Sequence, residues 1–366
     1  MRRVGSVLAA LVLLGGVLFA VLYKPSSGDG LTVVTGLIGS EKREFFADPE
    51  VIAEFRAKGL RIAPDTAGSW QMTTTDLGKY DFAFPASLSP AQVIAKQKGS
   101  GEPIRPFYSP LVVIAHASTA QVLRANGLAA QQADTGVWTF KMDQYLASLR
   151  ADRNWQDLKE AAGHAELAGS VYVTTTDPET SSSGALHVAA MSYLANERRV
   201  VSDPAGVDRV RDLVRKVTAM QGAQKTSSDE PFKDFLSGVG SPLVLVYESQ
   251  VAALTAHGGS TGDLVVLYPD TTVSSDHSVV AWNDGGRRMA ELLRDDEKLR
   301  ALEAKFGFRP QADPAAFGTA VHAGTGAPGS STGPVYAPDL SAAGVQQAPV
   351  PAADVLNQLV NVAKGK

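Results

Sequence analysis

The chain of 366 residues has 44% hydrophobic content, which is enough for a large buried core and corresponds to about two domains. Its net charge of −4, with no basic run in the part that should fold, argues against a nucleic-acid partner. The absence of cysteine excludes disulfides, thiolate metal sites, cysteine nucleophiles and the lipid anchor of bacterial lipoproteins, which needs a cysteine.

The N-terminus predicts an extracytoplasmic location. Arg2 and Arg3 precede an uncharged apolar run from Val4 to Tyr23, and a polar stretch starts at Lys24. The run is long enough to span a bilayer and lacks a good small-residue cleavage site, which favours an uncleaved anchor over a removed signal peptide. Residues 1–27 are therefore predicted to be a transmembrane anchor or signal segment, with the remainder outside the cytoplasm.

The next part of the chain alternates apolar strands with polar turns. Strands are predicted at Leu31–Thr35, Arg61–Asp65 and Asp81–Pro85, and each leads to a turn that contains glycine or serine. Asp48 as N-cap and Gly59 as terminator predict a helix between the first two strands. Because ligands lie beyond the carboxyl ends of parallel strands, the three turns are expected to share one edge of a sheet.

Two Ser-Pro sequences each introduce an apolar strand, at Ser109–Ala115 and at Ser241–Gln250. We expect Leu111–Ala115 and Leu243–Tyr247 to be the crossover strands of a two-lobed protein. The predicted fold is α/β, with each lobe a mostly parallel sheet flanked by helices. Residues 28–111 and 241–314 are assigned to lobe 1 and residues 112–240 to lobe 2.

The stretch Gly169–Asn196 combines a predicted strand at Val171–Thr176 with a helix through His187–Leu194. The turn between them, Thr180–Gly184, supplies four hydroxyl side chains and a glycine where the helix should begin. The start of a helix presents unpaired N–H groups and partial positive charge, so this turn could hold an anionic or polar group. Simple helix capping explains the same residues.

Other motifs in the chain offer rival interpretations. Gly258–Gly262 fits the GxSxG pattern of serine hydrolases through Ser260, but a helix precedes it and a strand follows, the reverse of a nucleophile elbow. Asp276 and His277 form the one carboxylate–imidazole neighbour pair and are interpreted as a turn. Composition becomes rich in Gly, Ala and Pro from Ala315 onward, which predicts a loosely wrapped tail over residues 315–366 with a short helix near its end.

The order of these motifs resembles the type II periplasmic or extracellular solute-binding proteins of ABC transport systems. The resemblance covers roughly Leu31 to Pro310. Its motifs are AGSW (67–70), YDFAFPAS (80–87), PFYSPLVVIA (106–115), TDPETSSSG (176–184), VYES (246–249), YPD (268–270) and LLRDDEKLRALEAKFGFRP (292–310). The missing lipobox cysteine and the long tail depart from the usual pattern.

The resemblance implies that two lobes close over a small polar solute, with oxyanions among the ligands of such proteins. It implies binding rather than enzymatic activity, a monomer, a membrane permease as partner, and neither a cofactor nor a metal. The residues that it places in the cleft are Gly39, Ser40, Gly68, Ser69, Thr180, Ser181, Ser182, Ser183, Tyr247 and Glu248. The alternatives are a membrane-tethered sensory or scaffold protein that uses the tail to engage a partner, and a hydrolase that uses Ser260.

Overall fold

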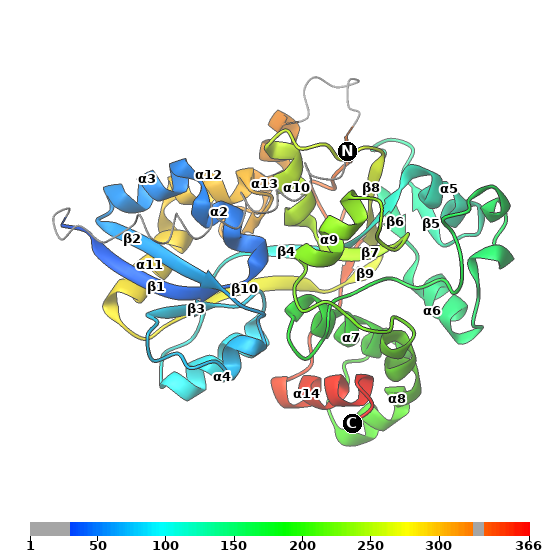
Figure 1. Ribbon diagram of the computed structural model, residues 1–366, viewed down its shortest axis with the longest axis horizontal. Helices are drawn as coiled ribbons and strands as arrows, with labels where there is room; N and C mark the ends of the chain where they lie inside the picture. The colour runs from blue at the N-terminus through cyan, green and yellow to red at the C-terminus, as the bar shows by residue number, and fades with distance from the viewer. Residues whose placement is uncertain (1–29, 325–332) are drawn as a thin grey trace, which may run out of the picture. The chain divides into compact units, whose positions relative to one another are not determined.

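One run of hydrogen-bonded strands extends through both halves of the protein, in the order β2-β1-β3-β10-β4-β8-β6-β5, with β7 and β11 also paired to β4 (Figure 1). The computed structural model describes residues 30–324 and 333–366, and the features below lie in the unit Val33–Lys366. The strands are β1 (Thr32–Ile38), β2 (Leu60–Thr66), β3 (Phe82–Phe84), β4 (Ile104–His116), β5 (Ala129–Gln131), β6 (Trp138–Phe140), β7 (Val244–Tyr247), β8 (Leu264–Pro269), β9 (Thr271–Thr272), β10 (Ser274–Ala281) and β11 (Arg309–Pro310).

Lobe 1 is built on β1, β2, β3 and β10. One face is covered by α2 (Arg43–Ala47), α3 (Pro49–Ala57), α11 (Asp284–Asp295) and α12 (Glu297–Lys305), and the other by α4 (Leu88–Lys98). Successive residues of β3 alternate between the faces: Phe82 and Phe84 pack under the first set of helices, and Ala83 packs under α4. The predicted cap of α3 is present, since the Asp48 carboxylate accepts hydrogen bonds from two backbone N–H groups of its first turn.

Lobe 2 contains β5, β6, β7, β8 and the second half of β4. Its helices are α5 (Ala117–Ala125), α6 (Met142–Arg150), α7 (Ser182–Ala195), α8 (Pro204–Ala219) and α9 (Asp229–Leu236). In α7, 12 of 14 residues are buried, so this helix lies inside the lobe. The segment before it, predicted as a strand, forms only one β-bridge, in which Thr174 pairs with Val244 of β7.

The chain crosses between the lobes twice. β4 makes the first crossing: Tyr108–Pro110 pair with β10 of lobe 1, and Leu111–His116 pair with β7 and β8 of lobe 2. The return crossing differs from the prediction, because it runs from β8 through β9 into β10 and does not use Leu243–Tyr247. An apolar run marks a buried strand, but it does not reveal whether that strand crosses or stays in one sheet.

Strand directions follow from these crossings. The β1–β3 pair of lobe 1 is parallel, as the sequence predicts, and β6 and β8 also pair in parallel. Because β4 leaves lobe 1 and β10 returns to it, their mutual pairing is antiparallel, as are the pairs of β4 with β7 and β8. β7 and β8, which the sequence assigned to lobe 1, are therefore hydrogen-bonded into the sheet of lobe 2.

The C-terminal segment is packed against the rest of the chain. α13 (Ala315–Gly324) contacts α12, β12 (Gln346–Gln347) pairs in parallel with β9, and α14 (Ala353–Ala363) packs on α7 and α8 (Figure 1). Val355, Leu359 and Val362 of α14 are buried among the valines of α8. Along the chain, α10 (Glu248–Ala256) links β7 to β8.

The predicted N-terminal anchor, residues 1–27, lies outside the residues that the structure describes. Over 30–324 and 333–366, none of the helices combines the length and apolar character needed to cross a bilayer.

Candidate functional site

A chain of hydroxyl groups surrounds the start of α7. Thr176 Oγ1 lies 2.7 Å from Ser183 Oγ, and Ser181 Oγ lies 3.1 Å from the same atom. Gly184 is required here, since a Cβ at this position would come within 2.3 Å of the Thr176 carbonyl oxygen. The predicted hydroxyl turn therefore folds back on itself and gathers its side chains at one end of the helix.

Two turns of lobe 1 reach this helix start. Ser87, which follows β3, places its Oγ 2.7 Å from Ser182 Oγ in lobe 2. The backbone N–H of Trp70 donates to the Thr180 carbonyl oxygen at 3.0 Å, and Ser69 Oγ accepts a hydrogen bond from the Ala86 N–H at 2.9 Å. The turns after β2 and β3 thus meet α7, and the two lobes are in direct contact at their hydroxyl-bearing residues.

Tyr247 joins the same cluster from the end of β7. The Ser183 side chain, the Ser183 backbone N–H and the Ser275 side chain lie close enough to its hydroxyl to act on its pKa. Ser275, at the start of β10, donates to the Ala86 carbonyl oxygen. Burial is the largest influence and raises the pKa of Tyr247 far above its usual range, so the phenol stays neutral where α7, β7 and β10 meet.

A buried charged group adjoins the cluster and was missed in the sequence. The Lys42 ammonium contacts the Glu41 carboxylate and donates to His277 Nδ1 at 3.0 Å. The side chains of Lys42 and His277 are fully buried, and that of Glu41 is 5% exposed. Burial lowers the pKa of Lys42, against the influence of Glu41, and burial together with Lys42 lowers the pKa of His277. We refer to Glu41, Lys42 and His277 as the buried charge cluster.

The interpretation of Asp276 and His277 as a turn is wrong. Both residues lie in β10, where alternation sends their side chains to opposite faces. His277 therefore enters the core among Phe84, Phe107 and Phe308, whereas Asp276 lies at the surface and pairs with Arg105 at 3.3 Å. The sequence of 274–281, SSDHSVVA, has no alternation of polar and apolar residues, so only its apolar end, Val279–Ala281, signalled a strand.

Gly39 and Ser40 lie at the edge of the buried charge cluster. A Cβ on Gly39 would come 2.3 Å from a Glu41 carboxylate oxygen, so the glycine makes room for this acid. Ser40 begins a short 3-10 helix, η1 (Ser40–Lys42), and is half-buried. Within the described part of the chain, Ser40 makes none of the hydrogen bonds that join Ser69, Ser87 and α7.

Glu248 lies in a different cluster from the other predicted site residues. Its carboxylate is fully buried and accepts two hydrogen bonds from the Arg309 guanidinium, at 2.7 and 2.8 Å, and a third from the Tyr268 hydroxyl. Arg309 also donates to the carbonyl oxygens of Ala337 and Pro338 in the C-terminal segment. Glu248, the first residue of α10, therefore has the partners of a structural ion pair and lies apart from the hydroxyl groups around Tyr247.

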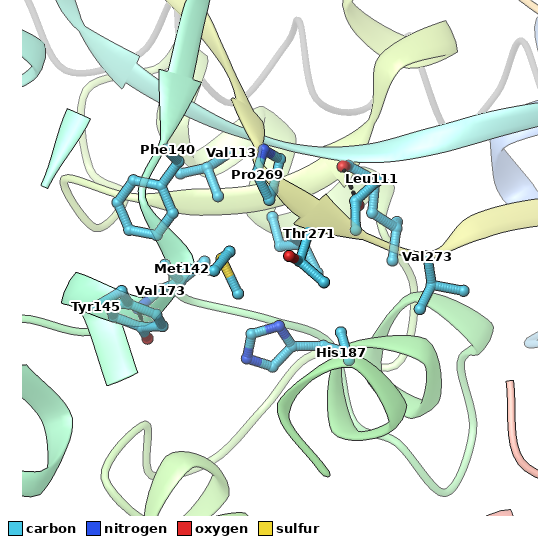
Figure 2. A pocket seen from close by; sticks show the side chains of 13 residues that line it. Leu111, Val113, Phe140, Met142, Tyr145, Val173, His187, Pro269, Thr271 and Val273 are labelled. Carbon is cyan, nitrogen blue, oxygen red and sulfur yellow. Dashed lines mark hydrogen bonds between the residues drawn. The ribbon is translucent and has the colours of Figure 1, made fainter. Parts of the chain in front are cut away.

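A small apolar cavity lies behind α7 in lobe 2. Figure 2 shows the His187 ring pointing into a space bounded by Met142, Tyr145 and Thr271. The cavity of roughly 20 Å³ has room for about one water molecule. His187 Nε2 is buried without a protein partner among the described residues, and burial lowers the pKa of His187 to about 4.

Ser260 lies in an exposed loop that follows α10 and precedes β8, which is the wrong order for a nucleophile elbow. No group of three potential metal ligands (His, Cys, Asp or Glu) was found among the residues that the structure describes.

Comparisons with known proteins identify the architecture. Neither family models nor curated sequences give a match. Among solved structures, a periplasmic thiamin binding protein matches with a TM-score of 0.56 and 12% identity over 93% of this chain and 98% of its own. Iron-bound HitA from Pseudomonas aeruginosa matches with a TM-score of 0.56 and 11% identity over 91% and 99%.

A third similar structure is the sulfate-binding protein SubI from Mycobacterium tuberculosis H37Rv, with a TM-score of 0.53 and 17% identity over 79% of this chain and 90% of the other. At these identities the comparisons establish the fold, and they agree with the two crossings and the helix-flanked sheet described above. The chain has the type II fold of the periplasmic solute-binding proteins.

Proposed function

We propose that this protein is an extracytoplasmic solute-binding protein whose two lobes close over a small polar ligand. The observation that carries the proposal is the contact between Ser87 of lobe 1 and Ser182 of lobe 2, at 2.7 Å. Ser69 bonds to the N–H of Ala86, the neighbour of Ser87, and Ser183, the neighbour of Ser182, bonds to Thr176. Hydroxyl groups from both lobes thus converge on the start of a buried helix, where a polar ligand gains hydrogen bonds and a favourable helix dipole.

Ligand binding would exchange the direct contacts between the lobes for contacts through the ligand. In the structure, Ser87 and Ser182 satisfy each other, and Trp70 N–H satisfies Thr180. A ligand that offers both donors and acceptors could replace these bonds without leaving a buried hydroxyl unpaired. Differential affinity for the closed arrangement would then drive closure.

The wider role that we propose is delivery of the solute to an ABC-type permease by a monomer held at the outer face of the membrane. Support comes from the fold shared with periplasmic binding proteins and from the apolar segment Val4–Tyr23. The similar structures are described as binding sulfate, thiamin and iron. That range supports a small solute, and the hydroxyls alone suit an oxyanion as well as a neutral ligand.

A sensory or scaffold role for the tail receives less support. The apolar side chains of α14, including Val355, Leu359 and Val362, are already buried against lobe 2. Lys364 and Lys366 form ion pairs with Asp177 and Glu179 beside the hydroxyl turn. A helix used in this way inside its own chain has little apolar surface left to offer a partner.

A thermal-shift screen of the full-length protein against oxyanions, amino acids and sugars tests the proposal. We expect one ligand class to raise the unfolding midpoint, and Ser69→Ala combined with Ser182→Ala to abolish that rise. The control is Ser237→Ala combined with Ser341→Ala, which removes two exposed hydroxyls and should leave the rise intact. An unchanged rise in the Ser69/Ser182 double variant would remove the site from the proposal.

A further inference from the structure

The buried charge cluster places an acid of the chain itself beside the proposed ligand site. Glu41 contacts the Lys42 ammonium, and its Oε1 lies 3.6 Å from His277 Nδ1. Its carboxylate fills the space above Gly39, where a Cβ would lie 2.3 and 2.4 Å from the two oxygens. With a side chain only 5% exposed, Glu41 is held as an internal anion in this corner.

This anion adjoins the start of α7. The His277 ring is centred 5.6 Å from the Tyr247 ring, and the side chain and N–H of Ser183 in α7 lie close enough to the Tyr247 hydroxyl to act on its pKa. The charge of Glu41 also acts on Tyr247 and on Asp229, and contributes to the raised pKa of each. Glu41 therefore lies where the chain folds hydroxyls, a lysine and a helix start into one polar corner.

The positively charged side chains of Lys42 and Arg43 already have acidic partners and are not available to a free anion. Lys42 already pairs with Glu41, and it lies over the Phe84 ring at 4.7 Å, away from solvent. Arg43, which is 53% exposed, lies 3.9 Å from the Asp229 carboxylate. An anion at this site would therefore be repelled by Glu41 and Asp229, while Lys42 and Arg43 already pair with these two acids.

We propose that Glu41 is a specificity-determining residue that occupies the anion position of this site and excludes divalent oxyanions from it. The inference rests on the proposed solute-binding function and narrows its ligand class to neutral or cationic polar solutes. The oxyanions suggested by the family resemblance would then be excluded by a side chain of the protein.

Removal of the Glu41 carboxylate should change the site from one that excludes oxyanions to one that binds them. In Glu41→Gln, Lys42 remains buried beside His277 without its carboxylate partner, which destabilises the fold. A tetrahedral oxyanion could supply the missing negative charge and use the hydroxyls and the helix start. The variant should therefore unfold at a lower temperature than wild type in chloride and regain stability when an oxyanion is added.

The test measures unfolding midpoints of the full-length protein with sodium sulfate and sodium molybdate, at ionic strength matched with sodium chloride. We expect a rise of about 3 °C or more in Glu41→Gln, beyond the small general effect of sulfate on protein stability. Wild type should show only that general effect. The control is Glu44→Gln, which removes an exposed acid three residues away and should respond like wild type.

Two results would overturn the inference. One is an equal oxyanion response in Glu41→Gln and Glu44→Gln. The other is tight binding of sulfate or molybdate by wild type in calorimetry, which needs no variant and so decides the question even if Glu41→Gln does not fold. Failure of the solute-binding proposal is a separate outcome. In that case none of the neutral, cationic or anionic probes would stabilise wild type.

Discussion

Ser87 Oγ and Ser182 Oγ lie 2.7 Å apart, although 95 residues separate them in the chain. One residue follows β3 of lobe 1, and the other begins α7 of lobe 2. Both side chains are buried, so water does not compete freely for their hydrogen bond. This hydrogen bond is therefore a direct contact between the two lobes.

A double-mutant cycle should detect this contact. We expect Ser87→Ala and Ser182→Ala to be coupled by about 1 kcal/mol in the free energy of unfolding, because each variant alone removes the same hydrogen bond. The measurement is chemical denaturation of wild type, both single variants and the double variant. Ser87→Ala combined with Ser192→Ala is the control, since Ser192 bonds to Ala189 within α7, and its effects should add. Additive effects for Ser87 and Ser182 would contradict a bond between the lobes.

Gly68→Ala should separate the lobes. A Cβ at Gly68 would lie 2.5 Å from the Thr180 carbonyl oxygen, and neither backbone can move aside without breaking the bond from Trp70 N–H to Thr180. We expect a loss of about 1 to 3 kcal/mol in unfolding free energy and a larger radius of gyration in solution scattering. Gly163→Ala is the control, because nothing lies within 4 Å of its added Cβ. If both variants behave alike, this contact does not hold the lobes together.

Arg309→Met should release the C-terminal segment. The substitution leaves the fully buried Glu248 carboxylate without its cation and removes the donors to Ala337 and Pro338. Breaking such a pair costs about 3 to 5 kcal/mol, and proteases should then cut residues 333–366 sooner. Arg287→Met, which breaks an exposed pair with Asp284, should cost at most about 1 kcal/mol. Equal losses in the two variants would refute the structural role of the buried pair.

His187 should make the protein sensitive to mild acid. Its pKa is lowered to about 4 in the folded state, compared with about 6.5 when unfolded. Below pH 6.5, His187 of the unfolded chain therefore binds a proton that His187 of the folded chain does not bind. The free energy of unfolding falls as the pH drops toward 4. The loss from this residue should reach about 3 kcal/mol at pH 4.

Unfolding midpoints measured between pH 7 and pH 4 provide the check. His187→Leu places an apolar side chain beside the cavity of Figure 2 and should reduce the acid sensitivity. Some sensitivity should remain, because the pKa of His277 is also lowered. His164→Leu, at a more exposed position, should keep the wild-type pH profile. A His187→Leu profile that follows wild type would show that this histidine is not buried as described.

The alternation of strands, turns and helices was readable in the sequence because it depends on local patterns. Asp48 followed by Pro49 marks the start of α3, and the serines before Leu186 mark the start of α7. The turns after β2 and β3 were also expected to share one edge of a sheet, since parallel strands end on the same side. These inferences need only the spacing of residues along the chain, whereas the convergence of Ser69 with the α7 turn was an expectation from the resemblance to solute-binding proteins.

Tertiary structure alone decided the partners of the charged residues. Lys42 and His277 are separated by 235 positions, and Glu248 and Arg309 by 61, and no local pattern states that such residues meet. The return crossing was likewise undetermined. The apolar strand β7 stays in lobe 2, and the crossing runs through the more polar β9 and β10, which only the hydrogen-bond pairing of the strands reveals. The sequence therefore determined the strands, helices and hydroxyl-bearing turns that local patterns mark, with β10 and the segment before α7 as exceptions. The packing of the lobes determined which charges are buried together, since burial depends on contacts between distant segments.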